Sequence, residues 1–374
     1  MNFEMITDTA SLQRVCQLAS NHQAVMLDTE FVRTRTLYPK LGLVQLYDGE
    51  HLSLIDPIEI DDLTPLWDLL SNPSVTKVLH ACSEDLEVFQ HYSGLMPTPM
   101  VDTQVMAAFL GHGLSTGFAS LVEEYLDVTL DKGEARTDWC ARPLTPRQME
   151  YAAADVFYLY PLYQLLAEKL AETPWQSAMA EECVSICRKR AKQPDPEKAY
   201  LDIKNAWQLR PAQLAVLKKL AKWRLKEAQR RDLALNFVVK ELNIWKVARY
   251  QIRSLRKMEE EGFDRFEMDR HGKRLISMAL EADKMSEEHF PEPISRLVDM
   301  PGYKQVVKVV KEQVNAVSEE LGFVPEFIGS KKQINQAIKW VWVQDKSPEK
   351  RPDLLNGWRG ELMADKVLPL LEPK

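Results

Sequence analysis

The sequence predicts a mixed α/β domain followed by two all-α helical bundles. Strand and helix patterns alternate through the first half of the 374-residue chain. After Pro194 and Pro196, which mark a polar linker, strand signals nearly vanish. The charge also changes sign: residues 1–194 carry 14 Lys and Arg against 27 Asp and Glu, whereas residues 195–374 have a net charge of +6. An acidic part that holds cations and a basic part that meets a polyanion would explain this asymmetry, although solvated surface charge can also segregate by chance.

The first half contains strand and helix candidates in alternation. The strands at 24–31, 42–48 and 52–56 are joined by loops too short for a helix, so we expect antiparallel hairpins. The later strands are separated by helices, which favours parallel pairing. The strand candidates are residues 3–6, 24–31, 42–48, 52–56, 75–80 and 99–102. The helix candidates are residues 9–19, 62–71, 83–92, 103–110, 117–126, 146–171 and 175–190.

The pattern of the second half is typical of helices joined by short polar turns. A second break, at Pro291 and Pro293, divides this half into two bundles. The helix candidates here are residues 211–231, 236–249, 273–284, 291–298, 303–320, 331–342 and 351–371.

These breaks define the expected domains. We predict a first domain at residues 1–192, a linker at 193–206, and helical domains at 207–290 and 293–371. Because tryptophan commonly packs at helix junctions, we expect five of them in the bundle cores. These are Trp207, Trp223, Trp245, Trp340 and Trp358.

The composition argues against several classes of protein. The cysteines are odd in number and scattered, and no Cys-x-x-Cys pair occurs, so neither a zinc site nor a disulfide framework is indicated. No apolar run is long enough to span a membrane, and the first residues have no basic, apolar signal segment. We therefore expect a cytoplasmic protein. No obligate protein partner is indicated, and we expect a monomer, although the sequence leaves the oligomeric state open.

Two acids stand at the end of an apolar strand candidate. Asp28 and Glu30 follow four hydrophobic residues and are two apart, so they point to the same face. Two neighbouring carboxylates on a buried strand repel each other unless cations neutralise them, and hard divalent metals prefer oxygen ligands. For an isolated Asp-x-Glu pair, two solvated acids at a strand end are the more common arrangement, so the rest of the chain must decide.

A third acid follows the strand candidate at 75–80. Asp85 lies in the first turn of the next helix, with Ser83 as the expected N-cap. A carboxylate just after a strand–helix turn lies at the functional edge of an α/β sheet. Taken alone, Asp85 is better explained by its favourable interaction with the helix dipole.

A fourth acid lies in a long helix that Thr145 and Pro146 begin. Tyr151 and Asp155 are four residues apart and share one face, with three alanines between them that allow close packing. A tyrosine cannot deprotonate water at neutral pH, but it can orient a water molecule. A half-buried Tyr beside a solvated Asp is the common alternative.

Together, these segments resemble a known family of enzymes. Residues 28–31, 80–85 and 151–155 are similar, in this order, to the three motifs of the DEDD superfamily of 3′-5′ exonucleases. The tyrosine four residues before the last aspartate is typical of the tyrosine branch. Nearly the whole chain resembles the ribonuclease D family, whose C-terminal helical domains are called HRDC. Further matching segments are residues 41–46, 101–103, 136–139, 142–144, 223–232, 236–239, 331–335 and 357–362.

The resemblance implies an RNase H-like fold and a site for two divalent metal ions, Mg²⁺ or Mn²⁺. It implies that Asp28 bridges both ions, that Glu30 and Asp155 complete the site of the attacking water, and that Asp85 supports the second ion. Tyr151 would position that water. The implied reaction removes nucleoside 5′-monophosphates from the 3′ end of RNA, with tRNA precursors as the expected substrates.

Other residues are candidates for holding the RNA. Four lie near the acids and can stack on or hydrogen-bond to nucleotides: Phe31, Gln45, His80 and Trp139. Residues 218–231 contain seven Lys and Arg against one acid, a pattern that favours phosphate contact. The alternative is a solvated basic helix face. The basic candidates are Lys218, Lys222, Arg230 and Arg231.

Two other functions are compatible with the motifs. A DNA exonuclease shares them, but the chain contains no polymerase or helicase segment. A non-catalytic RNA-binding scaffold with a decayed nuclease fold should have lost a metal ligand, whereas all five catalytic positions are intact.

Overall fold

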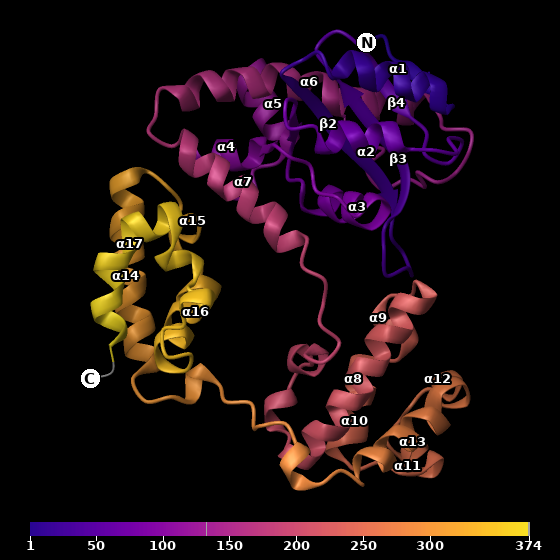
Figure 1. Cartoon of the computed structure of the whole chain (residues 1–374), viewed down its shortest axis with the longest axis vertical. Helices are drawn as coiled ribbons and strands as arrows, with labels where there is room; N and C mark the ends of the chain where they lie inside the picture. The colour runs from indigo at the N-terminus through magenta and orange to yellow at the C-terminus, as the bar shows by residue number, and fades with distance from the viewer. Residues whose placement is uncertain (132, 373–374) are drawn as a thin grey trace. The chain divides into compact units, whose positions relative to one another are not determined.

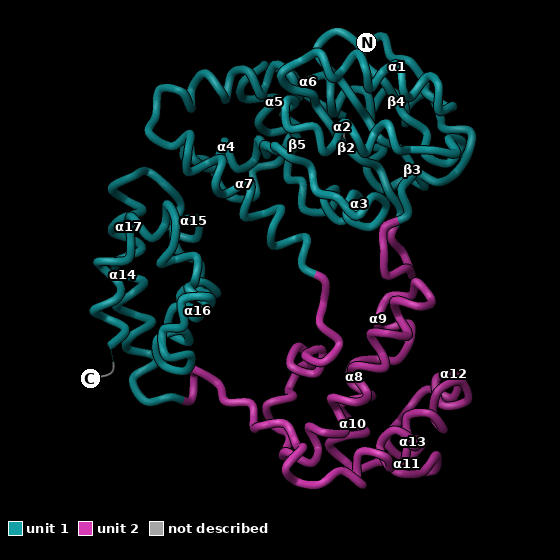
Figure 2. The backbone as a smooth tube through the Cα atoms, in the orientation of Figure 1, with its two compact units in different colours: residues 1–32, 40–192, 300–374 teal, residues 33–39, 193–299 magenta. Residues whose placement is uncertain are grey.

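The computed structural model describes residues 1–131 and 133–372, which form two compact units (Figure 2). The first unit comprises Met1–Val32, Lys40–Lys192 and Met300–Lys374. The second comprises Arg33–Pro39 and Gln193–Asp299. The last helices of the chain therefore share a unit with the N-terminal sheet. Within the described residues, no helix is both long enough and apolar enough to cross a membrane.

The first unit is built on a mixed six-stranded sheet, of which Figure 1 labels β2, β3 and β4. The strand order is β1-β4-β3-β2-β5-β6. Strand β3 pairs antiparallel with both β2 and β4, as the short loops predict. The pairs β2–β5, β5–β6 and β1–β4 are parallel. The strands are β1 (Glu4–Ile6), β2 (Ala24–Val32), β3 (Lys40–Tyr47), β4 (Leu52–Ile55), β5 (Thr76–Leu79) and β6 (Met100–Asp102).

Helices cover this sheet, and the longest of them contacts three strands. Helix α6 packs against β2, β3 and β4 and begins at the predicted residue, where Thr145 and Gln148 form a capping box. The helices of this part are α1 (Thr9–Ala19), α2 (Thr64–Ser71), α3 (Ser83–Ser93), α4 (Thr103–Phe109), α5 (Phe118–Leu126), α6 (Pro146–Ala171) and α7 (Gln176–Arg190). Each overlaps its predicted range.

The C-terminal helices pack on α4 and α7 of the same unit. Phe327 contacts the rings of Phe109 and Trp358, with centroids 4.7 and 5.2 Å away. Arg359 forms an ion pair with Glu182, and the two side chains are only 7% and 12% exposed. This part contains α14 (Tyr303–Leu321), α15 (Pro325–Gly329), α16 (Lys331–Trp342) and α17 (Gly357–Leu371).

The second unit is helical, with a core in which α8 packs against α10 and α13. The segment Arg33–Pro39 belongs to it: Leu37 packs on that core, and Asp232 accepts a hydrogen bond from the Tyr38 backbone N–H at 3.0 Å. Its helices are α8 (Pro211–Arg231), α9 (Leu235–Val238), α10 (Glu241–Arg249), α11 (Leu255–Glu260), α12 (Arg265–Glu267) and α13 (Lys273–Ala282).

Three predictions for the helical regions are wrong. Residues 236–249 form two helices, because the Val239 carbonyl accepts a hydrogen bond from the buried Arg224 guanidinium at 2.8 Å. Residues 291–298 form only the start of a 3₁₀ turn at Leu297–Asp299, since prolines lack an amide donor and disfavour a helix before them. Trp207 is 40% exposed rather than buried, and the Arg296 guanidinium lies 3.6 Å from its ring centroid.

The last predicted helix, residues 351–371, also begins later than expected. Only a 3₁₀ turn forms at Asp353–Leu355, and Asn356 is extended with ψ at 154°. Helix α17 then starts at Gly357, whose φ of +55° favours glycine.

Candidate active site

Strand β2 delivers two carboxylates to one face of the sheet. It lies between β3 and β5, and Asp28 and Glu30 are two residues apart on it, so their side chains leave the same face. The three residues before Asp28 are fully buried. Across the sheet, Gln45 of β3 donates from Nε2 to Asp28 Oδ2 at 3.4 Å. These acids therefore continue a core strand and do not belong to a solvated loop.

Helix α6 brings the next acid to the same place. Tyr151 and Asp155 are one turn apart on it, and the first two alanines between them are fully buried. Carboxylate oxygens of Asp28, Glu30 and Asp155 lie within 4.8 Å of one another. Among the described residues, these three acids form the group that can hold a metal ion.

Asp85 approaches from the first turn of α3 and is 7% exposed. The Thr29 hydroxyl donates a hydrogen bond to Asp85 Oδ1. The turn before α3 is held by Asp102, which accepts from the backbone N–H groups of Ala81 and Cys82 at 2.9 and 3.0 Å. Because Ala81 has φ +53°, in the left-handed region, these two bonds stabilise a costly conformation. The Asp85 side chain is thus held by Thr29, and the turn before its helix is held by Asp102.

A cavity of about 240 Å³ opens where these elements meet. The His80 ring at its wall faces Phe118 at 5.6 Å, and His80 Nδ1 lies 2.9 Å from the Thr103 hydroxyl. The lining residues are Asp28, Thr29, Glu30, His80, Phe118, Tyr151, Asp155 and Leu159.

The surroundings of the four acids disfavour the ionised form of each carboxylate. Burial, followed by repulsion from Asp85, Asp155 and Glu30, raises the pKa of Asp28 well above its ordinary value. Burial also raises the pKa of Glu30 to about 9, of Asp155 to about 7 and of Asp85 to about 6. A cluster of this kind is stabilised by protons or by cations. The carboxylates of Asp28, Glu30 and Asp155 line the small cavity, and oxygen ligands of this kind fit hard divalent ions such as Mg²⁺ and Mn²⁺.

The Tyr151 hydroxyl stays protonated beside these acids. Burial and then the charges of Asp155, Glu30 and Asp28 raise the pKa of its phenol above the ordinary value. A protonated phenol can orient a bound water by hydrogen bonding, but it cannot act as a general base at neutral pH.

The residues predicted to hold nucleotides have different surroundings. His80 lines the cavity, and Phe31 follows Glu30 at a register shift in the strand. Gln45 is fully buried and contacts Asp28. Trp139 is 1% exposed, so its ring has no free face for a base to stack on in this structure.

The four basic candidates belong to α8 in the second unit, and each is ion-paired there. Lys218 and Lys222 pair with Glu197, and Arg230 and Arg231 pair with Glu227. Exposed pairs of this kind contribute little to stability, so a phosphate can exchange with the carboxylate. Their contact with RNA stays a prediction.

Sequence reasoning assigned no individual role to three residues that shape the site: Thr29, Asp102 and Phe118. Thr29 stands between the two strand acids, and nothing local shows that its hydroxyl reaches Asp85. Asp102 carries a signal, because an Asp before a helix is a typical N-cap, and it accepts from the Gln104 backbone N–H at 2.8 Å. Its second role, at the turn before α3, depends on the parallel pairing of β5 with β6.

Comparison with known proteins agrees with this geometry. A family model described as 3'-5' exonuclease matches residues 3–171. A model described as HRDC domain matches residues 213–278, and one described as ribonuclease D, C-terminal HRDC domain, matches residues 301–367.

Individual relatives are similar to this chain over its full length. Ribonuclease D of Serratia proteamaculans (strain 568) is 51% identical over 372 residues, which cover 100% of both chains. Ribonuclease D of Escherichia coli (strain K12) is 50% identical and covers 100% of this chain and 99% of its own. A crystal structure of E. coli RNase D, described as an exoribonuclease involved in structured RNA processing, has a TM-score of 0.96 at 49% identity and covers 99% of both chains. The chain belongs to the ribonuclease D family and is a 3′-5′ exoribonuclease.

Proposed function

We propose that this exoribonuclease hydrolyses RNA from the 3′ end with two divalent metal ions, releases nucleoside 5′-monophosphates, and matures the 3′ ends of tRNA precursors. The observation that carries the proposal is the convergence of three partly buried carboxylates from β2 and α6 within 4.8 Å. The raised pKa values of these acids support it, because a bound cation offsets both the burial of the carboxylates and the repulsion between them. The domain division given above, with an exonuclease domain at 1–192 and helical domains at 207–290 and 293–371, is part of the proposal.

The proposed roles are those that the resemblance to the family implies for each side chain. Asp28 would hold both ions, Glu30 and Asp155 the ion beside the attacking water, and Asp85 the other ion. When bound, the ions lower the pKa of water and neutralise charge on the leaving 3′-oxygen. The Tyr151 phenol holds the attacking water by a hydrogen bond.

The reaction conserves atoms as a simple hydrolysis. The oxygen of water bonds to the phosphorus of the terminal phosphodiester, and the bond from phosphorus to the 3′-oxygen breaks. One proton of water ends on the 3′-oxygen of the shortened RNA. The phosphate stays on the 5′ carbon of the released nucleotide.

The preference for tRNA precursors rests on the family. The E. coli relative is described as acting in structured RNA processing. In this chain, His80 and Phe31 are proposed to contact the terminal nucleotide, and Gln45 to support Asp28. The basic residues of α8 are proposed to contact phosphates, which gives affinity without sequence readout. They are Lys218, Lys222, Arg230 and Arg231.

A direct test compares Asp28→Asn with the wild-type chain on a 5′-labelled tRNA precursor, single-stranded RNA and single-stranded DNA. We expect trimming of RNA only when Mg²⁺ or Mn²⁺ is present, and a loss of at least about a hundredfold in the variant. Glu50→Gln removes an exposed carboxylate outside the cavity and serves as the control.

Each arm of this experiment can contradict a different part of the proposal. Wild-type trimming by Asp28→Asn excludes the metal roles. Equal rates on DNA and RNA argue for a general 3′-5′ exonuclease. Equal rates on single-stranded RNA and the tRNA precursor remove the preference for tRNA.

A further inference from the structure

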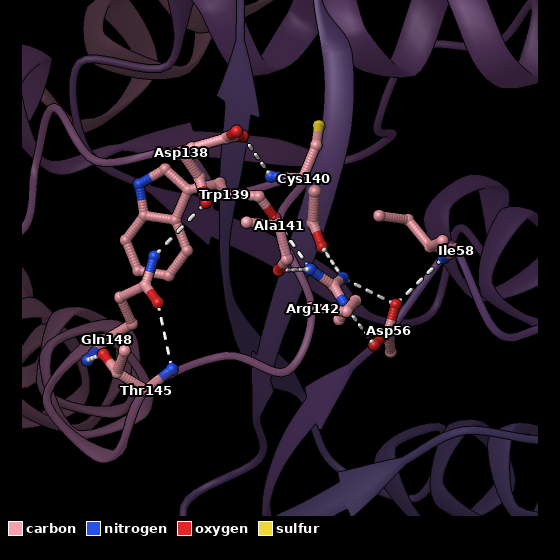
Figure 3. Close-up of polar contacts among 10 residues, drawn as sticks. Asp56, Ile58, Asp138, Trp139, Cys140, Ala141, Arg142, Thr145 and Gln148 are labelled. Atoms are coloured by element: carbon pink, nitrogen blue, oxygen red, sulfur yellow. Dashed lines mark hydrogen bonds and ion pairs between the residues drawn. The ribbon is translucent and has the colours of Figure 1, made fainter.

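One arginine fastens the loop at residues 137–145 to the sheet (Figure 3). Arg142 makes a two-pronged ion pair with Asp56, with Nε–Oδ2 and Nη2–Oδ1 distances of 2.6 and 2.7 Å. Its Nη1 also donates to the carbonyls of Trp139 and Ala141, both at 2.9 Å, and Nη2 donates to the Gly42 carbonyl at 2.7 Å. All three nitrogens of the guanidinium therefore have partners, and lysine cannot reproduce this pattern.

The loop lies directly on the backbone of β3. A Cβ atom built on Gly42 would be 2.5 Å from the Trp139 carbonyl oxygen and 2.8 Å from the Trp139 Cβ. No side chain fits between the two backbones, so the position of Trp139 is set by the sheet. The Arg142 guanidinium donates to the Trp139 and Gly42 carbonyls and so stabilises this contact between the two backbones.

The other end of the loop is tied to the first turn of α6, three residues before Tyr151. Gln148 Nε2 donates to the Thr137 hydroxyl at 3.0 Å, and Gln148 Oε1 accepts from the Thr145 backbone N–H at 3.0 Å. The loop therefore joins the sheet to the helix that carries Tyr151 and Asp155.

Between these two anchors, Trp139 packs against Tyr151. Their ring centroids are 6.1 Å apart, with an angle of 42° between the ring planes. Trp139 is 1% exposed, and its surroundings in the core include Ala152 and Leu144. The indole therefore forms a wall behind the phenol.

We propose that Arg142 is a positioning residue for Tyr151: it holds Trp139 against the sheet, and Trp139 in turn fixes the phenol in the cavity. This inference rests on the proposed function, in which Tyr151 orients the attacking water. A displacement of about 1 Å at a reacting group can cost about a hundredfold in rate, so a wall behind the phenol affects turnover more than RNA binding.

The test is a double-mutant cycle with Arg142→Lys, Tyr151→Phe and the double variant. Steady-state kinetics are measured on a single-stranded RNA oligonucleotide at saturating Mg²⁺. We expect Arg142→Lys to lower kcat by about tenfold with KM within about twofold of wild type. In the Tyr151→Phe background, the same change should lower kcat by less than about twofold, because the phenol it positions is gone.

The matched control is Arg253→Lys in the second unit. Arg253 pairs with Asp283 through the same two nitrogens at 2.6 and 2.7 Å, and its Nη1 donates to the Ile252 carbonyl at 3.0 Å. The Arg253→Lys variant loses the same kind of contacts outside the first unit. We expect the kcat of this variant to equal that of wild type.

A readout other than turnover separates positioning from general damage. Mn²⁺ binding, measured by calorimetric titration, should be unchanged in Arg142→Lys. If this variant does not fold, Trp139→Phe removes the indole wall and leaves the ion pair in place, and it should show the same coupling with Tyr151→Phe.

The outcomes distinguish the proposed role of Tyr151 from the positioning role of Arg142. A wild-type rate for Tyr151→Phe contradicts the proposed role of the tyrosine, and the positioning inference falls with it. A slow Tyr151→Phe combined with a full tenfold effect of Arg142→Lys in that background overturns the positioning inference alone. A rise in KM without a fall in kcat overturns it as well, since it points to RNA binding.

Discussion

The Thr29 hydroxyl donates a hydrogen bond to the Asp85 carboxylate, linking the strand that carries two acids to the helix that carries another. This bond lowers the pKa of Asp85 and opposes the effect of burial, which raises it. The Thr29 hydrogen bond therefore favours the ionised form of the Asp85 carboxylate.

Thr29→Val should weaken metal binding while keeping the shape of the side chain. We expect the Mg²⁺ concentration for half-maximal activity to rise roughly tenfold, which is the scale for a partner of a metal ligand. Thr29→Ser keeps the hydroxyl and should stay within about threefold of wild type. Equal Mg²⁺ dependence in Thr29→Val and wild type would show that the bond has no part in metal binding.

Metal binding should stabilise the protein more at high pH than at low pH. Folded pKa values of about 9 for Glu30, 7 for Asp155 and 6 for Asp85 exceed ordinary values. The folded state thus holds more protons than the unfolded state. The stability that these groups contribute is complete below about pH 4, and it is lost as pH rises through the folded values.

Thermal unfolding with EDTA or Mg²⁺ measures this effect. We expect the increase in Tm on adding Mg²⁺ to be larger at pH 8 than at pH 6, because fewer protons then compete for the carboxylates. Glu30→Gln should reduce the difference between the two pH values. The same increase at both values would mean that protons and cations do not share this site.

Removing one ring from the contact between the C-terminal helices and α4 should destabilise the first unit. Phe327 is 3% exposed and packs on Phe109, so Phe327→Ala leaves a cavity and should lower the free energy of unfolding by about 3–5 kcal/mol. Phe266→Ala provides the control, because Phe266 is 78% exposed, and it should change the free energy by less than about 0.5 kcal/mol. Urea unfolding measures both; equal values would show that the packed rings add no stability.

The ion pairs of α8 give a prediction with a definite sign for RNA affinity. Glu197→Gln removes the partner of Lys218 and Lys222 and should tighten RNA binding at low salt. Lys222→Ala should weaken binding and reduce the slope of log affinity against log salt by about 0.7 to 0.9. Binding titrations across a salt series check both variants. An unchanged slope in Lys222→Ala would identify α8 as a solvated face.

The features that could be predicted from the sequence are local ones. Thr145, Pro146 and Gln148 mark the start of α6 within four residues, and the predicted and observed bounds agree. The shared face of Asp28 and Glu30 follows from the period of a strand, and that of Tyr151 and Asp155 from the period of a helix.

The remaining features depend on residues that are distant in sequence. Tryptophan is a residue type that stacks on bases, so Trp139 is a reasonable candidate from the sequence. Only the close approach of the Gly42 backbone shows that Trp139 is enclosed by the protein. The break after α9 depends on Arg224, which draws the Val239 carbonyl out of a helical pattern that the local sequence supports. Lys222 looks like a free cation until Glu197, 25 residues earlier, is found beside it.

The segment Arg33–Pro39 has consequences for how the chain can be divided and made. It connects β2 to β3, yet its packing partners, among them Asp232 and Ala234, are about 200 residues later in the sequence. During synthesis, the two strands can pair long before their connecting loop has anything to pack on. A fragment that starts at the linker therefore contains the first helical bundle but lacks the segment Arg33–Pro39 that packs on it. The N-terminal domain made alone contains this segment without the helices on which it packs.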